Sequence, residues 1–187
     1  LRPCKNHAAI LQVFRRILDR EPNAVLLLVG DGPMRAAIQD QIQQLQLTPH
    51  VRILGIRSDA TALMQVADVF LFPSLREGLS VAVMEASAVG LPIVASDIPG
   101  NREATENGAS ARLHDIQDIE GMAGSVVDLL RDSDARQHLG AIARQVYEQS
   151  FSMEASICRL SELYDRVLHR PSTEPITNFG LHGRILT

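Results

Sequence analysis

The sequence predicts an α/β fold in which a parallel sheet carries helices on both faces. Three observations lead to this prediction. Apolar runs of strand length alternate along the chain with segments of helical periodicity. The runs are apolar at nearly every position, which is typical of strands covered on both faces. Each unusual turn follows one of these runs, as in open parallel sheets, where ligands bind beyond the carboxyl ends of the strands.

The elements follow from periodicity and from turn residues. A helix is predicted over residues 6–20, because apolar side chains recur at helical spacing and the pattern stops near Pro22. The run AVLLLVG at 24–30 predicts a strand covered on both faces. By the same arguments we expect, in chain order, a helix at 34–45, a strand at 51–55, a short helix at 59–66, a strand at 68–72, a helix after Leu79, a strand at 92–96, a short strand at 109–114, and helices at 118–131, 134–149 and 153–168.

The domain organisation is expected to be simple. With 187 residues the chain has the size of one domain. We expect this domain to cover 1–169 and to close with the helix at about 153–168. Residues 170–187 are rich in Pro and Thr and show no periodicity, so they are expected to form a poorly ordered tail. The chain begins at Leu1 without methionine, which is compatible with a fragment.

Composition excludes several classes of protein. A net charge of -4 without a Lys/Arg cluster argues against a nucleic-acid-binding surface. Cys4 and Cys158 form no C-x-x-C pair, which favours a reducing, cytoplasmic setting over a disulfide framework or a zinc site. The six histidines show no i,i+4 pair, so no metal site is expected. The longest apolar runs are interrupted by acidic residues and are too short to span a membrane.

The turn REGLS, which leads into the helix at Val81, is the first candidate binding element. Gly78 lets the backbone approach a ligand closely, and Ser80 is placed to cap the helix. The N–H groups from Leu79 to Ala82 would then face outward at the positive end of the helix dipole, where an anion such as a diphosphate would fit. The alternative is an ordinary N-capped helix that packs on the sheet.

Two carboxylates and a lysine lie near this turn. Glu85 falls in an apolar helix, where a carboxylate needs a partner; a ribose diol and a buried ion pair with Arg57 or Arg102 are equally compatible with the local sequence. Glu77 would face the end of a diphosphate remote from the ribose, or would be a solvated loop residue. Lys5 could neutralise the diphosphate, although a lone lysine is more often a solvated surface residue.

Several stretches together resemble a known family. They are KNH at 5–7, LLLVGDGPMR at 26–35, VRILGIRSD at 51–59, ADVFLFPSLREGLSVAVMEASAVGLPIVASDIPGNRE at 67–103 and FSMEASICRLSELYDRVL at 151–168. They are similar to the C-terminal, donor-binding domain of retaining glycosyltransferases of the GT-B fold, the group 1 or family 4 class. The most specific element is the E-x7-E motif, matched by Glu77 and Glu85.

The resemblance implies a Rossmann-like domain that binds a nucleotide-diphosphate sugar, without a metal or other cofactor. In such a domain Glu85 would bind the ribose hydroxyls, and Lys5 would bind the diphosphate. Glu77 would contact the donor sugar and its developing positive charge, which makes it the candidate catalytic residue. The backbone at Leu79, Ser80 and Val81 would hold phosphate and sugar hydroxyls, and the turn near Arg57 would lie by the base.

The sequence also departs from the family. The arginine that usually precedes the lysine by about five positions would fall before Leu1, and Arg2 is not in that register. Ser80 stands where a second glycine is often found. The family's N-terminal acceptor domain is not part of this chain, so the chain alone is expected to bind the donor without transferring sugar. The closing helix is expected to expose an apolar strip where that domain docks.

Two other functions remain open at this point. The chain could be a stand-alone nucleotide-binding or regulatory module. It could also be part of another GT-B enzyme, such as a nucleotide-sugar epimerase, but the register of Glu77 and Glu85 argues against an epimerase. The sequence does not determine the sugar, the base or the acceptor. It also does not determine whether the full-length protein lies at the inner face of the membrane.

Overall fold

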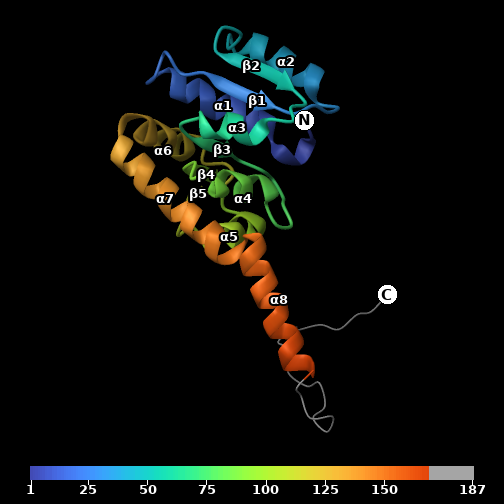
Figure 1. Cartoon of the computed structure of the whole chain (residues 1–187). Helices are drawn as coiled ribbons and strands as arrows, with labels where there is room; N and C mark the ends of the chain where they lie inside the picture. Colours follow the sequence, from blue (N-terminus) through green and yellow to red (C-terminus); the bar gives the residue numbers. More distant parts are fainter. Residues whose placement is uncertain (169–187) are drawn as a thin grey trace. The chain divides into compact units, whose positions relative to one another are not determined.

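A computed structural model of the chain describes residues 1–168, which fall into two compact units divided between Phe151 and Ser152. The first unit holds all the strands (Figure 1). Its elements in chain order are η1 (Pro3–Lys5), α1 (His7–Leu18), β1 (Leu26–Val29), α2 (Arg35–Gln44), β2 (Val51–Gly55), α3 (Ala60–Gln65), β3 (Phe70–Phe72), α4 (Val81–Ala88), β4 (Ile93–Ser96), α5 (Pro99–Ala104), β5 (Arg112–His114), α6 (Ile119–Arg131) and α7 (Ser133–Ser150).

The predicted α/β class is confirmed, and all strand pairs are parallel. The strands are hydrogen-bonded in two sheets, however, and not in one: β1 pairs with β2, and β3, β4 and β5 form a second sheet in that order. Apolar runs indicate which segments are buried, but they do not determine which edges pair. The register shift between Leu28 and Val29 shows that β1 is irregular near its carboxyl end. Two short helical segments, η1 and α5, were not predicted.

The two sheets share a hydrophobic core. The apolar stripe of α1 is buried against α6 and α2, and the same cluster contains Leu28 of β1 and Val94 of β4. The turn after α1 is also linked to α6 by ion pairs, in which Arg20 contacts Glu120 and Arg131 contacts Glu21. The core therefore fixes β1 and β4 relative to α1, although no strand joins the sheets directly.

A second cluster lies between α4, β4 and α7. Helix α7 approaches the loop after α4 so closely that a Cβ atom on Gly140 would lie 2.1 Å from the carbonyl oxygen of Gly90. Gly140 is therefore required by packing. This contact holds the carboxyl end of α4, which leaves the opposite end of the helix to face the carboxyl ends of the strands.

The expectation that the first strand is covered on both faces is wrong for the described residues. Leu27 and Val29 of β1 are 40% and 39% exposed, whereas Leu28 between them is buried. Successive side chains of a strand point to opposite faces. In the part of the chain that the structure describes, β1 is therefore covered on one face only.

The second unit contains α8 (Met153–Leu168), and its bounds match the predicted closing helix. Its apolar residues Ile157, Leu160, Tyr164 and Val167 are all more than half exposed. The predicted domain boundary at 169 stays a prediction. The predicted tail at 170–187 lies outside the described residues. Among residues 1–168, no helix is both long enough and apolar enough to cross a membrane.

Candidate functional site

The loop that follows β3 is held by the first residues of the chain. Pro73 and Ser74 are buried directly after the strand. The backbone carbonyl of Cys4 accepts a hydrogen bond from the N–H of Leu75 and another from the Ser74 hydroxyl, each at 2.8 Å. These bonds place η1 beside the carboxyl end of β3, so the residues that precede α1 contribute to the same edge as the REGLS turn.

Lys5 and Glu77, 72 positions apart, meet at this edge. The Lys5 ammonium lies 2.8 Å from Oε1 of Glu77, and the Ser74 hydroxyl lies 2.5 Å from the same oxygen. Lys5 also lies over the ring of Phe72, 4.7 Å from its centre. Both side chains are largely covered, with 33% of Lys5 and 14% of Glu77 exposed. Neither one is the freely solvated residue that the alternative interpretation described.

Lys5 supplies a partly covered positive charge at this edge. An ammonium group has three N–H donors, so the bond to Glu77 leaves donors that an anion could use. His7, two residues further on, adds little positive charge near neutral pH. Burial, reinforced by the positive charges of the chain's amino terminus and of Lys5, lowers the pKa of His7 below its usual value.

Helix α4 begins beside this pair, but not in the way predicted for Ser80. Ser80 occupies the N-cap position, yet its side chain makes no capping hydrogen bond. Its hydroxyl donates to Oδ1 of Asn101 instead, and the residue is fully buried. The prediction that Ser80 caps the helix through its side chain is therefore wrong. Since the Ser80 side chain accepts no hydrogen bond from the N–H groups of the first turn, these groups remain available to an anion. Leu79 and Val81 on either side are 40% and 59% exposed.

Glu85 lies on the exposed side of α4, one turn beyond Val81. The expectation that it is buried in an apolar helix is wrong, because α4 buries its other face through Val83, Ala86 and Ser87. The ion-pair alternative is also wrong: Arg57 is paired with Asp59, and Arg102 with Asp97.

These arginine pairs explain two pKa shifts. The hydrogen bonds from Arg57 lower the pKa of Asp59, and those from Arg102 lower the pKa of Asp97.

Within residues 1–168, Glu85 has no hydrogen bond or ion pair. Its carboxylate is thus exposed and unpaired on the helix that begins beside Lys5 and Glu77.

Arg57 lies in the exposed turn after β2. Its guanidinium donates two hydrogen bonds to Asp59, at 2.7 and 2.5 Å. The turn is tied to the end of β1, where the N–H of Gly30 donates to the carbonyl of Gly55. No hydrogen bond or ion pair within the described chain links Arg57 to Lys5, Glu77 or Glu85. The structure therefore joins Lys5 directly to Glu77, and among the described residues it does not join Arg57 to either of them by a hydrogen bond.

Sequence reasoning missed the polar residues behind the site. Ser74, Ser96 and Asn101 were not among the predicted site residues. Ser74, Ser96 and Asn101 are fully buried and hydrogen-bonded. Ser74 lies in the loop that follows β3, Ser96 ends β4, and Asn101 lies in the short helix α5 that follows β4. A polar residue at or just after the end of a strand was the sequence signal that could have identified them.

A Ser–His–Asp arrangement occurs elsewhere in the first unit. Nε2 of His114 lies 2.8 Å from the Ser125 hydroxyl, and Nδ1 lies 3.3 Å from Asp118. A nucleophilic serine also needs donors for the developing oxyanion. Ser125 lies in the interior of α6, where the backbone N–H groups are used by the helix itself, and Asp118 caps the same helix through the N–H of Gly121. We therefore assign these three residues a structural role in joining β5 to α6.

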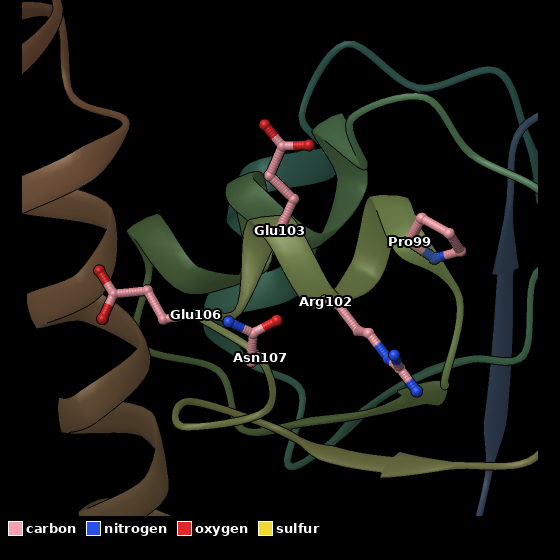
Figure 2. Close-up of a pocket in the computed structure, with 5 residues that line it drawn as sticks. All are labelled: Pro99, Arg102, Glu103, Glu106 and Asn107. Atoms are coloured by element: carbon pink, nitrogen blue, oxygen red, sulfur yellow. The ribbon is translucent and has the colours of Figure 1, made fainter. Parts of the chain in front are cut away.

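A shallow pocket over α5 contains none of the predicted site residues. It is lined by Pro99, Arg102, Glu103, Glu106 and Asn107, whose polar side chains point in different directions (Figure 2). Arg102 is neutralised by Asp97, and Glu106 accepts a hydrogen bond from Ser150. Residues 1–168 contain no cluster of three or more His, Cys, Asp or Glu side chains that could hold a metal ion. The edge defined by Lys5, Glu77 and α4 is the better candidate site.

Solved structures show which fold this domain adopts. The domain is similar to HepE of Anabaena, solved with UDP and glucose, with a TM-score of 0.79 at 23% identity over 88% of this chain and 46% of that one. It is also similar to TarM of S. aureus, with a TM-score of 0.81 at 20% identity over 88% of this chain and 34% of that one. These likenesses show the GT-B fold.

The chain belongs to the family of glycosyl transferases group 1, whose model matches residues 1–146. Among curated relatives, it is 31% identical to the N-acetyl-alpha-D-glucosaminyl L-malate synthase of Bacillus anthracis over 168 residues, which cover 89% of this chain and 44% of the relative. The chain thus spans less than half the length of this relative. The resemblance to a group 1 GT-B glycosyltransferase is confirmed.

Proposed function

We propose that this chain binds the nucleotide-diphosphate-sugar donor of a retaining glycosyltransferase of the hexosyltransferase type. The observation that carries the proposal is the meeting of Lys5 and Glu77, 2.8 Å apart, beside the start of α4, whose exposed side carries Glu85. A cation, the positive end of a helix and two carboxylates at one edge match the parts of such a donor. HepE and TarM, which share the fold, were both solved with UDP, so UDP is the first nucleotide to test.

Each part of the donor has an assigned partner in this proposal. The diphosphate binds the free N–H donors of Lys5 and the first turn of α4, including the backbone at Leu79, Ser80 and Val81. The ribose diol donates to the exposed carboxylate of Glu85. The turn that contains Arg57 lies by the base of the nucleotide. No metal is required, because Lys5 and the helix supply the positive charge.

Glu77 would act on the sugar. Its carboxylate contacts the donor sugar and stabilises the positive charge that develops at the sugar ring as the bond to the diphosphate breaks. Lys5 holds this carboxylate in place by donating to Oε1, and the Ser74 hydroxyl contacts the same oxygen. Sugar transfer also needs an acceptor hydroxyl close to the anomeric carbon. Transfer to the acceptor is therefore proposed for the whole protein and not for this chain alone.

A panel of nucleotide sugars tests the proposal. The melting temperature of the chain is measured with UDP-, GDP-, ADP- and dTDP-sugars and with each free nucleoside diphosphate. A ligand that binds only the folded state raises the melting temperature with increasing concentration. We expect one base to be preferred. A chain that no member of the panel stabilises would not be a donor-binding domain.

The ion pair gives a prediction for Glu77. In Glu77→Gln, a free nucleoside diphosphate should bind with unchanged or higher affinity, because Lys5 no longer shares its charge with a carboxylate. Affinity for the intact donor should fall by roughly tenfold, the size expected for one hydrogen bond to a charged group. Calorimetry with UDP and with a UDP-sugar measures both. Equal losses for the two ligands would contradict the role in sugar binding.

A further inference from the structure

We propose that Asn101 is a positioning residue for Glu77, acting through the loop 74–80 that carries the carboxylate. The inference rests on the proposed function of Glu77. Within residues 1–168, the Asn101 side chain makes no hydrogen bond to Glu77 or Lys5. It bonds to the Ser80 hydroxyl at one end of the loop and is linked through Ser96 to Ser74 at the other end, while its neighbour Gly100 packs against the middle.

The amide of Asn101 joins the start of α4 to the end of β4. Oδ1 accepts a hydrogen bond from the Ser80 hydroxyl. Nδ2 donates to the backbone carbonyl of Ser96 at 2.8 Å and lies 3.2 Å from the Ser96 hydroxyl. The residue is 0% exposed, so none of these bonds competes with water. Ser80, the last residue of the loop, is thereby fixed to β4.

The other end of the loop is fixed to the same strand. The Ser96 hydroxyl donates to the backbone carbonyl of Ser74 at 2.6 Å. A continuous chain of hydrogen bonds therefore runs from Ser74 through Ser96 and Asn101 to Ser80. Buried networks in which every member is satisfied hold one conformation, because an unpaired buried polar group is costly.

The middle of the loop packs directly on α5. A Cβ atom placed on Gly100 would lie 2.4 Å from the carbonyl oxygen of Gly78 and 2.7 Å from that of Glu77. Only glycine allows this approach. With both ends tied through Asn101 and the middle resting on Gly100, the loop has little freedom, and the Glu77 side chain starts from a fixed backbone.

The test compares Asn101→Ala with Thr105→Val. Thr105 is also fully buried in the segment after Asn101, and its hydroxyl donates to the Asn101 carbonyl at 2.7 Å. Among the described residues Thr105 makes no hydrogen bond to the loop 74–80. Its substitution therefore removes a buried bond to the Asn101 backbone and leaves the clamp, the chain of hydrogen bonds from Ser74 through Ser96 and the Asn101 side chain to Ser80, in place. Ser80→Ala cuts the clamp at one end and serves as a second variant if Asn101→Ala does not fold.

Two readouts are taken for each variant. Hydrogen exchange of the amides at 75–80, without nucleotide, reports the loop itself; it should speed up in Asn101→Ala and Ser80→Ala and stay unchanged in Thr105→Val. Calorimetry reports affinity for a UDP-sugar, which should fall roughly tenfold in the two clamp variants and stay unchanged in the control.

The outcomes separate this inference from the function on which it rests. Unchanged loop exchange in both clamp variants, or equal losses of affinity in Thr105→Val, would overturn the positioning role. A wild-type chain that binds no nucleotide sugar would instead overturn the proposed function, while the exchange data would still decide whether Asn101 holds the loop.

Discussion

Replacing Lys5 by methionine should weaken the binding of free nucleoside diphosphates by roughly 10- to 100-fold, since a hydrogen bond to a charged group contributes about 1.5 to 3 kcal/mol. Methionine keeps an unbranched apolar stem over Phe72 and removes only the charge and its donors. In the structure, Lys5 is the cation that faces Glu77 at this edge. The affinity of UDP for the wild-type and variant chains, measured by calorimetry, checks the prediction.

Arg2→Met provides the matched control. Arg2 lies in the same N-terminal segment and is exposed, but it has no assigned contact with the donor. Its removal should leave the affinity unchanged at moderate ionic strength, because an exposed charge at a distance is screened by salt. Equal losses in both variants would show that the chain attracts nucleotides through its overall charge, and not through Lys5.

Glu85→Gln should weaken both UDP and UDP-sugars, because the ribose is present in both. A carboxylate that accepts hydrogen bonds from a diol contributes about 1.5 to 3 kcal/mol, so we expect roughly 10- to 100-fold weaker binding. Stability should not change, since Glu85 is exposed and has no partner within residues 1–168. This pattern differs from that of Glu77→Gln, which should lower the affinity for the intact donor only.

Glu103→Gln is the control for Glu85. Glu103 is an exposed carboxylate of α5 and lines the shallow pocket of Figure 2. Its substitution should leave UDP affinity unchanged. If Glu103→Gln weakened UDP and Glu85→Gln did not, the nucleotide would bind over α5 and the assigned site would be wrong.

The elements of this fold could be predicted because they depend on local patterns. The apolar stripe of α1 and the closing helix at Met153–Leu168 follow from helical spacing, and their bounds needed little correction. The pairing of strands could not be predicted in the same way. It depends on how β1 ends and on which helices fill the core, and both are decided by contacts between distant parts of the chain.

In the candidate site, too, local features could be predicted and contacts between distant residues could not. Sequence placed Lys5 and Glu77 at one edge, but only the fold shows that they bond to each other. Glu85 was misplaced because α4 is almost uniformly small and apolar, so its composition does not tell which face is buried: Val81 is 59% exposed, whereas Ser87 is 1% exposed. Ser80 was expected to make a local cap, and its actual partner, Asn101, lies 21 residues away.

The most direct test of the donor site is a map of backbone amide chemical shifts, recorded by NMR as UDP is added to the chain. We predict saturable changes that are largest at Lys5 and its neighbours and at residues 77–86, with smaller changes in the rest of the first unit. The same titration with Glu85→Gln should saturate at higher UDP concentrations. The account would be contradicted if the largest changes fell at Glu103–Asn107, around the pocket of Figure 2, or if no residue showed saturable changes.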